Sequence, residues 1–340
     1  MKLLVVIVSA VTFLNVLPVF AQELPDRASV VRPAHTYSIV ARDPETGQIG
    51  VAAQSHWFSI GTLVPWAEAG VGAVVTQSFV EARYGASGLD LMRAGWNASR
   101  ALDALRTADE HPEIRQVAMI DASGEVAAFT GKGCIPHAGH RVGSNFSVQA
   151  NLMLNDGVLV EMEKAFLNTV GSLAERMLAA LQAAQSGGGD LRGRQSAALV
   201  VVRGKSSGRP WEDRIVDLRV DDHSLPVQEL ARLLRLHQAY DFMNRGDLAI
   251  ERDDVDGALR EYSSAQRLVP DNTEMKFWHA ASLVNAGRVD EALPIFRQVF
   301  AEEPNWRLLV PRMSGVKLLP ADPAMIDRII SIEAGEQPLH

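Results

Sequence analysis

Thr36 lies where a threonine could act as a catalytic nucleophile. The segment His35–Asp43 places it at the start of a short apolar strand, directly after a stretch that contains Pro25 and Pro33. A threonine hydroxyl is a weak nucleophile, and an N-terminal amine beside it is one of the few bases that can activate it. Cleavage of the chain before Thr36 would supply that amine, whose ordinary pKa of about 7.7–8.0 suits a general base. The alternative is that Thr36 is simply a β-branched residue in a strand, which the local sequence favours.

A second group of reactive side chains lies in the glycine-rich loop 189–197. Arginine binds carboxylates through two parallel hydrogen bonds, so Arg192 and Arg194, with Gln195, are candidate substrate-binding residues. Asp190 is a candidate catalytic residue that could hold an arginine or the ammonium group of a new N-terminus. The alternative is a salt-bridged connection between a helix and a strand.

Polar side chains also recur where the predicted strands end. Ser55 and His56 follow one strand, Gln77 ends another, and Asn151 ends a third. Amide groups at strand ends could stabilise an oxyanion, so Gln77 and Asn151 are candidate catalytic residues. Ser55 and His56 are candidate substrate-binding residues. Each of the four, taken singly, is also explained as an ordinary strand-end cap.

Cofactor and metal sites are not predicted. Cys134, His137 and His140 are each three residues apart, a spacing that zinc ligands can have, but the segment is rich in glycine and a fourth ligand is not evident. The sequence carries no phosphate-cradling or dinucleotide-binding motif. Cys134 is the single cysteine, which excludes an internal disulfide.

The N-terminus has the pattern of an export signal. A single basic residue, Lys2, precedes an apolar run, and Val19–Ala21 offers small residues at the cleavage positions, so residues 1–21 are predicted to be a signal peptide. The alternative is an N-terminal membrane anchor. Residues 22–35 are interpreted as a linker or propeptide. We expect an exported protein, periplasmic or extracellular, without a stable membrane span after signal cleavage.

Length, composition and net charge indicate the number of domains and the kinds of partner that the protein can bind. The 340 residues favour two domains, and 47% hydrophobic with 22% charged residues is ordinary for a globular protein. Loss of Lys2 with the signal changes the net charge from −8 to −9. This acidic balance argues against nucleic acid or anionic lipid as a partner.

The pattern of elements predicts an α+β fold in residues 36–224. Ser87 and Asp90 resemble a capping box that opens a helix over 88–106. An apolar stripe that includes Val170 predicts one long helix ending at Gly187. Strands are expected at 47–54, 70–78, 117–120, 126–129, 196–202 and 215–220. The last of them should be an edge strand or a half-exposed strand, because apolar and polar residues alternate in it. Sheets covered by helices follow from this order.

Residues 225–340 are predicted to be helical and to contain a repeat. Matching residues recur with an offset of 34 residues, which is typical of tetratricopeptide repeats. The matched pairs are Gly246 with Ala280, Ala258 with Ala292, Tyr262 with Phe296, and Pro270 with Pro304. Two repeats are too few to stand alone, so helices near 225–240 and 321–333 are expected to cap them.

The α+β part resembles a bacterial family catalogued as domain of unknown function 1028. The resemblance rests on His35–Gly47, Gly50–Ser55, Val64–Ala67, Ala69–Gln77, Tyr84–Gly85, Gly88–Leu89, Arg115–Val117 and Gly188–Ala197. It implies a four-layer αββα sandwich similar to the N-terminal-nucleophile hydrolases, with Thr36 as the mature N-terminus. Some relatives carry Lys at the position of His56, which leaves the assisting base open. The region after residue 225 resembles one that is labelled peptidoglycan-binding in relatives, whereas its repeat favours a tetratricopeptide-like interaction module.

Two functions of different classes follow. One is an exported amidohydrolase that acts on a small amide or peptide with Thr36 as nucleophile. The other is a non-catalytic binding protein, in which the sandwich is a scaffold and the helical repeats bind a peptide, a protein or a cell-wall fragment. A shared fold does not decide between them.

Overall fold

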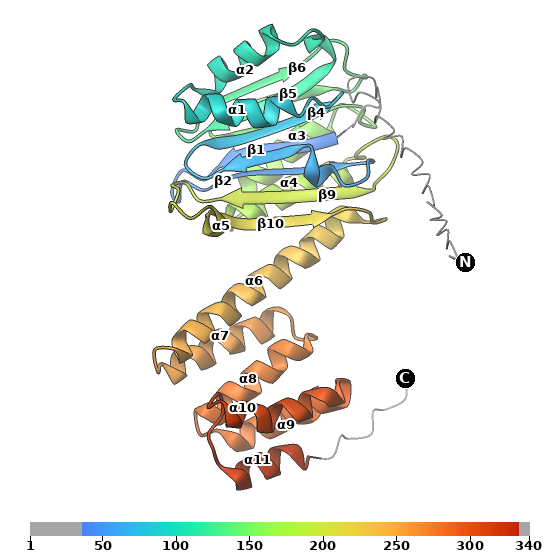
Figure 1. The fold of residues 1–340 in the computed structure, drawn as a ribbon. Coiled ribbons are helices and arrows are strands. Elements are labelled where there is room, and N and C mark those ends of the chain that lie inside the picture. Colours follow the sequence, from blue (N-terminus) through green and yellow to red (C-terminus); the bar gives the residue numbers. More distant parts are fainter. Residues whose placement is uncertain (1–35, 333–340) are drawn as a thin grey trace, which may run out of the picture. The chain divides into compact units, whose positions relative to one another are not determined.

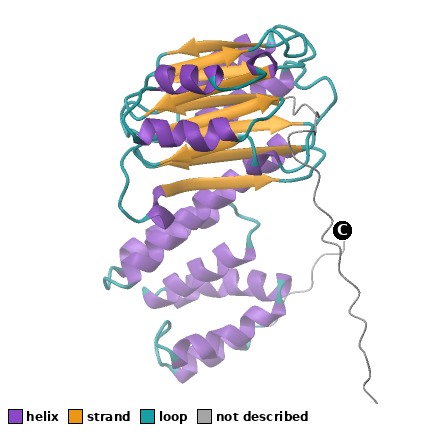
Figure 2. Cartoon of the chain, turned by 45° about the horizontal axis from the view of Figure 1, so that its top comes forward, coloured by secondary structure: helices purple, strands orange, loops and turns teal. Residues whose placement is uncertain are grey.

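The computed structural model describes residues 36–332, so the predicted signal peptide (1–21) and the linker or propeptide (22–35) lie outside the described residues. An α+β region with two antiparallel sheets is followed by an all-helical region (Figure 1). Figure 2 shows this division by colour, with every strand in the first region. The α+β expectation and the helical C-terminal region are confirmed at this level.

One sheet has six strands, in the order β10-β9-β2-β1-β8-β7. Its strands are β1 (Thr36–Arg42), β2 (Ile49–Ser55), β7 (Gly139–Gly143), β8 (Phe146–Ala150), β9 (Ser196–Val202) and β10 (Arg214–Val220). Strands β2 and β9 are buried along their whole length, as their continuous runs of small and β-branched residues predict. Strand β10 lies at the edge, as its alternating pattern predicts.

The other sheet has four strands, in the order β3-β4-β5-β6. Its strands are β3 (Pro65–Glu68), β4 (Gly72–Ser78), β5 (Arg115–Asp121) and β6 (Val126–Thr130). The predicted hairpin is β5–β6, in which Val117 pairs with Phe129. Its turn contains Gly124 with φ of 93°, a left-handed conformation that glycine adopts without strain.

The two sheets face each other through a shared apolar core. Val40, Val51 and Val200 of the six-stranded sheet pack in one cluster with Val75 and Ile120 of the four-stranded sheet. Because side chains alternate along a strand, the residues between these positions face outward towards helices. The inner layer is apolar at this end and polar at the other, where Thr36 lies.

Helices α1 (Arg83–Arg93) and α2 (Ala98–Thr107) pack on the outer face of the four-stranded sheet. The prediction of one helix over 88–106 that Ser87 caps is wrong. Ser87 lies inside α1, and the chain leaves the helix around Gly95, whose φ of 90° ends it. Asn97 then caps α2 through a hydrogen bond that its side chain accepts.

Helices α3 (Val158–Asn168) and α4 (Leu173–Ser186) pack on the outer face of the six-stranded sheet. The predicted single long helix is therefore two. Ser172 and Glu175 form a capping box that starts α4, so the helical path is interrupted before it. Val170, which the apolar stripe included, lies in this interruption and is 97% exposed. The helix ends at Gly187 as expected.

Helix α6 (Pro226–Ile250) begins inside the α+β region. Its residues Val227, Leu230 and Leu234 belong to the core cluster beneath the six-stranded sheet. The division between residues 224 and 225 stays a prediction, and a fragment ending there would lack these three core side chains.

Two residues that the predicted repeat includes, Gly246 and Tyr262, meet in the helical region. Gly246 of α6 contacts Tyr262 of α7 so closely that an added Cβ would lie 2.5 Å from the ring. The matched positions Ala280 and Phe296 are fully buried on α8 and α9. The remaining helices are α5 (Pro210–Asp213), α7 (Val255–Leu268), α8 (Thr273–Asn285), α9 (Val289–Glu302), α10 (Leu309–Gly315) and α11 (Pro323–Ile330), with 3-10 helices η2 (Ile60–Thr62), η3 (Pro112–Ile114) and η4 (Pro304–Leu308).

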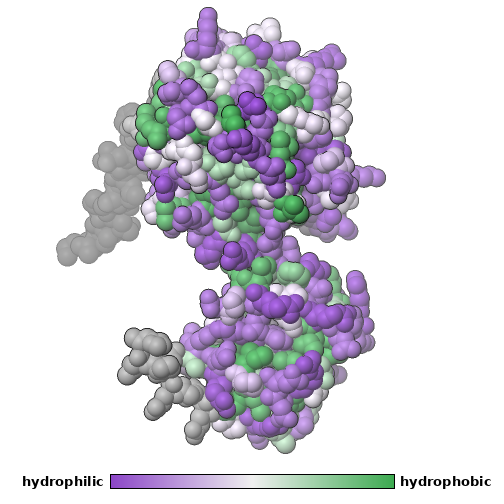
Figure 3. Space-filling view, turned by 180° about the vertical axis from the view of Figure 1, so that it is seen from behind, coloured by the Kyte–Doolittle hydropathy of each residue, from purple (hydrophilic) through white to green (hydrophobic). Residues whose placement is uncertain are grey.

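On the face drawn in Figure 3, hydrophilic residues are spread over both regions and are interrupted by smaller hydrophobic areas. Such mixing is usual for a protein surface. Within residues 36–332, no helix has the length and apolar character needed to cross a membrane.

Candidate functional site

Thr36 is the first residue of β1, a strand that lies between β2 and β8 inside the six-stranded sheet. It is fully buried and pairs with Ser55 across β2. Its backbone carbonyl accepts two hydrogen bonds, one from Gln77 Nε2 at 3.1 Å and one from the Asn151 backbone N–H at 3.2 Å. Three of the residues predicted for the site, Thr36, Gln77 and Asn151, are therefore brought into direct contact.

A polar cluster fills the space between the sheets beside Thr36. It consists of five fully buried residues, Ser38, Gln77, Gln116, Gln149 and Asn151. Ser38 Oγ donates to Gln77 Oε1 at 2.5 Å and accepts from Gln149 Nε2 at 2.7 Å. Gln116 Oε1 accepts from Gln77 Nε2 and from Asn151 Nδ2, each at 2.7 Å. Buried amides are costly unless they are paired, and these pair with one another across the two sheets.

Gln116 is the hub of this polar cluster. Besides the two bonds it accepts, its Nε2 lies within hydrogen-bond distance of Thr130 Oγ1 at 2.9 Å, Gly139 O at 3.0 Å and Ala150 O at 2.9 Å. It thereby connects β5 and β6 of the four-stranded sheet with β7 and β8 of the six-stranded sheet. The groups that hold the Thr36 carbonyl are positioned through this residue.

Asp190 anchors the arginine loop. Its side chain is fully shielded from solvent and its carboxylate accepts from the Arg192 backbone N–H at 2.9 Å, from Arg192 Nη2 at 2.8 Å and from Arg192 Nε at 3.1 Å. It also accepts from the His56 backbone N–H at 3.2 Å. Because His56 directly follows the strand partner of Thr36, Asp190 ties the loop to the start of β1. Of the two roles predicted for Asp190, the structure contains the contact with an arginine.

Arg194 of the arginine loop and His56, which directly follows β2, are both exposed. His56 Nδ1 is 3.4 Å from the Arg194 carbonyl oxygen. Among residues 36–332, the Arg194 guanidinium makes no ion pair. Burial raises the pKa of Tyr37 far above its ordinary value. The positive charge of Arg194 lowers this pKa, and the negative charge of Asp190 raises it. Tyr37 donates to Gln185 Oε1 at 3.0 Å on the helix side of the sheet.

A row of three hydroxyl side chains crosses the sheet at this end. Thr36 pairs with Ser55, and Ser55 pairs with Ser196 of β9. Gln195 contacts this row through its backbone. Its N–H donates to the Ser55 carbonyl at 3.2 Å, and its carbonyl accepts from the His223 N–H at 2.8 Å. Its side chain is half-buried.

Cys134, His137 and His140 are not brought together. The Cys134 thiol donates to a backbone carbonyl of β5 at 3.4 Å, while His137 Nδ1 pairs with Asp156 at 2.7 Å and His140 Nδ1 with Thr130 Oγ1 at 2.8 Å. Within residues 36–332, no group of three histidine, cysteine or acidic residues is arranged to hold a metal ion.

Sequence reasoning missed part of the site. Ser38, Gln116 and Gln149 belong to the polar cluster but were not among the predicted residues. For Ser38 and Gln149, the available signal was the alternation of polar with apolar residues inside strands that are otherwise buried. Tyr37 was also missed, although it adjoins Thr36.

Gln54 contrasts with the polar cluster. Its side chain is fully buried on the helix side of β2, yet neither its Nε2 nor its Oε1 has a hydrogen-bond partner within residues 36–332. An unpaired buried amide destabilises the folded state.

Two comparisons with known proteins bear on this region. A family model described as "Family of unknown function (DUF1028)" matches residues 36–230. The crystal structure of protein SPO2555 from Silicibacter pomeroyi, whose description carries the same family name, is similar with a TM-score of 0.54 and 30% sequence identity, over 59% of this chain and 88% of that chain. No curated protein matches the chain. The family match extends into α6, where Leu230 completes the core.

Proposed function

We propose that this chain, which belongs to the DUF1028 family, is an exported amidohydrolase whose nucleophile is Thr36 once the chain has been cut before that residue. The observation that carries the proposal is the placement of Thr36. It starts an internal strand, is fully buried, and has its backbone held by the polar cluster on one side and, through its neighbours Ser55 and His56, by Asp190 on the other.

The packing of the helices supports the finer fold that we propose. Helices α1 and α2 lie on one sheet, α3 and α4 on the other, and the sheets pack face to face. This succession fits the four-layer αββα sandwich of the N-terminal-nucleophile hydrolases. The likeness supports a reaction class and leaves the substrate open.

In the proposed reaction, Thr36 Oγ1 attacks the carbonyl carbon of an amide and its own α-amine takes the hydroxyl proton. The proton passes to the leaving amine as the C–N bond breaks, which leaves an ester on Thr36. Water, activated by the same amine, hydrolyses that ester and restores the hydroxyl.

The geometry refines the proposed roles of the two amides. Gln77 Nε2 donates to the Thr36 carbonyl and to Gln116 Oε1, so both of its hydrogens are engaged. We therefore assign Gln77 to positioning the backbone of Thr36. Asn151 keeps the proposed role of stabilising the oxyanion.

The two arginines take different proposed roles. Arg192 is held by Asp190, whereas Arg194 is exposed and without an ion pair among the described residues. A planar guanidinium that is not engaged with the protein can bind a substrate carboxylate through two hydrogen bonds. We propose that Arg194 does so, with Ser55, His56 and Gln195 nearby.

The test is the mass and reactivity of the exported protein. We expect a mature chain that starts at Thr36, and a β-lactone probe that adds its full mass to that residue. Thr36→Ser, which keeps a hydroxyl, should retain the adduct and amide hydrolysis in a substrate screen, and Thr36→Ala should lose both. A mature chain starting at residue 22, or an adduct that persists in Thr36→Ala, would contradict the proposal.

A second candidate function has one observation in its favour. A cavity of about 480 Å³ in the helical region is lined by three acidic and three aromatic side chains, and its lining holds no basic residue. Among them, Tyr240 donates to Glu274 at 2.6 Å and Tyr262 to Asp247 at 2.7 Å. Such a lining suits a cationic peptide, and we propose that the tetratricopeptide-like helix pairs bind one.

Calorimetric titration with a lysine-containing pentapeptide tests this candidate. We expect Glu274→Gln to weaken binding and Glu303→Gln, an exposed acid that does not line the cavity, to leave it unchanged. Equal binding by the two variants would exclude the cavity as the binding site.

A further inference from the structure

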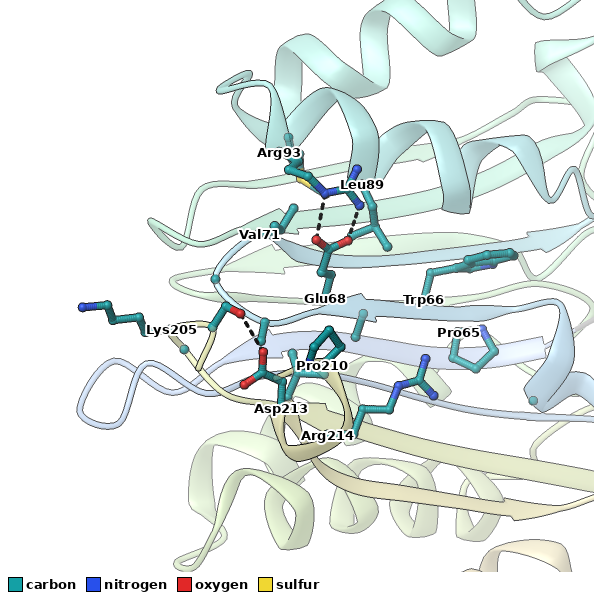
Figure 4. A pocket seen from close by; sticks show the side chains of 18 of the residues that line it. Pro65, Trp66, Glu68, Val71, Leu89, Arg93, Lys205, Pro210, Asp213 and Arg214 are labelled. Carbon is teal, nitrogen blue, oxygen red and sulfur yellow. Dashed lines mark hydrogen bonds and ion pairs between the residues drawn. The ribbon is translucent and has the colours of Figure 1, made fainter. Parts of the chain in front are cut away.

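The four-stranded sheet ends at β3, whereas the six-stranded sheet opposite continues past β9 to β10. A groove of about 1080 Å³ lies along this unpaired edge. Figure 4 shows Trp66 and Glu68 of β3 on one side and Lys205, Asp213 and Arg214 on the other. The lining includes Val202, which is at the opposite end of β9 from Ser196 and therefore away from Thr36.

The edge of β3 carries backbone groups that are not paired with another strand. Thr76 N–H donates to the Val64 carbonyl, so these two residues form a hydrogen-bonded pair. Hydrogen-bonded and non-hydrogen-bonded pairs alternate in an antiparallel ladder, so the N–H and C=O of Ala67 point away from β4. Within residues 36–332, Ala67 makes no hydrogen bond across that outer edge. A row of this kind is a template for an added strand.

The groove lining also carries surplus positive charge, because it holds four basic side chains (Arg93, Lys205, Arg214 and Arg219) and two acidic ones (Glu68 and Asp213). The Asp213 carboxylate already accepts hydrogen bonds from Ser206 Oγ and the Ser207 N–H. Arg214 and Arg219 share a single carboxylate, that of Asp217, and Lys205 has no ion pair within the described part of the chain. By contrast, Arg93 is matched by two acids, Glu68 and Asp90. A cationic groove on a chain with a net charge of −8 favours an anionic ligand.

We propose that an extended acidic peptide segment binds in this groove as a fifth strand beside β3. Its backbone would pair with Ala67, and its side chains would alternate between two environments. Ala67 packs towards the inner core. Peptide side chains opposite Ala67 would therefore face the cations of the β9–β10 side. The alternate peptide side chains would face the other way, towards Trp66, which packs on the α1 side.

Charge argues against a second copy of this chain as the occupant. A two-fold contact through β3 would place the same surface patch against itself. The unpaired Lys205 and the partly paired Arg214 and Arg219 of each copy would then meet like charges.

The test is fluorescence anisotropy of the full chain with a fluorescein-labelled peptide of sequence Glu-Val-Glu-Val-Glu, amidated at its C-terminus. Glutamates placed opposite Ala67 direct their N–H groups at β3, and the valine N–H groups point to solvent. N-methylation of the central glutamate should weaken binding by roughly three- to tenfold, the loss expected for one hydrogen bond. N-methylation of a valine is the matched control and should leave affinity within about twofold. Equal effects of the two methyl groups, or equal binding of the Lys-Val-Lys-Val-Lys peptide, overturns the proposal.

A protein variant gives the reciprocal test. Ala67→Pro removes one outward N–H at an edge position, where proline is tolerated, and should weaken the peptide as N-methylation does. Ala67→Val keeps the N–H and is the control. If Ala67→Pro does not fold, the two methylated peptides on the unaltered chain decide. Dimerisation that Ala67→Pro abolishes, without peptide binding, would assign the edge to a second copy and overturn the proposal.

Discussion

Gln116 and Gln54 allow the same substitution at two sites with opposite expected effects. Both side chains are fully buried in strands of the α+β region. Gln116 has partners at both of its amide atoms, while Gln54 has none in the part of the chain that the structure describes. Methionine has nearly the shape of glutamine without its hydrogen-bonding groups, so Gln116→Met and Gln54→Met isolate the contribution of those groups.

The hydrogen bonds set the expected magnitudes. Gln116→Met removes the acceptor of both Gln77 Nε2 and Asn151 Nδ2. Leaving a buried donor without a partner costs about 1–3 kcal/mol, so the free energy of unfolding should fall by roughly 2–6 kcal/mol. Gln54→Met removes an amide that has no partner to lose, and should raise the free energy of unfolding by about 1–3 kcal/mol.

Urea unfolding and thermal melts of both variants measure this. A change of 1 kcal/mol corresponds to about 2–4 °C in a region of this size, so the two melting temperatures should separate clearly in opposite directions. Gln116→Met should also impair any hydrolysis, because the groups that hold the Thr36 carbonyl depend on it. Equal destabilisation by the two substitutions would refute the reasoning, since the hydrogen-bond partners would then not decide the sign.

Four further substitutions have defined outcomes. Arg192→Lys should lower the melting temperature because it loses part of a paired guanidinium, whereas Arg194→Lys should leave it unchanged and weaken binding of a carboxylate substrate in a titration. Gly246→Ala should destabilise the helical region by about 1–3 kcal/mol in urea unfolding, since the new Cβ meets the Tyr262 ring. Burial alone would raise the pKa of Asp109, but hydrogen bonds from an arginine, a backbone N–H and a tyrosine lower it. Its contribution to stability is therefore present above about pH 4 and is lost as the pH falls through the lowered pKa, and Asp109→Asn should flatten this dependence in urea unfolding below pH 5.

Most of the predicted strands could be found because they are continuous buried runs with clear ends, whereas β3 and β7, which are not fully buried, were not predicted. The edge position of β10 followed from its alternation alone. The helix boundaries were predicted less well, because the spacing of apolar residues does not show where a helix is briefly interrupted. Gly95 and the capping box at Ser172 each break a stripe that the apolar spacing carries across.

The site was predictable in part. Polar residues at strand ends pointed to Gln77 and Asn151, and the structure brings both to the Thr36 carbonyl. Gln116 could not be found in this way, because a glutamine beside Arg115 at a strand start resembles a solvent-facing residue. Its burial depends on a second sheet that covers it, which local sequence does not encode.

The polar cluster has a consequence for how the strands find their partners during folding. In the apolar half of the inner layer, a strand that slipped by two residues along its neighbour would place one valine or isoleucine where another had been. The same side chains would still point to the core face of the sheet. In the polar half the same slip would move Gln149 from its position opposite Ser38 to one opposite Val40 or Thr36. Several amides would then be buried without partners, each at a cost of about 1–3 kcal/mol. Misaligned forms of β1 and β8 are thereby made unstable, so the residues that surround Thr36 also select the single alignment in which Thr36 reaches its place.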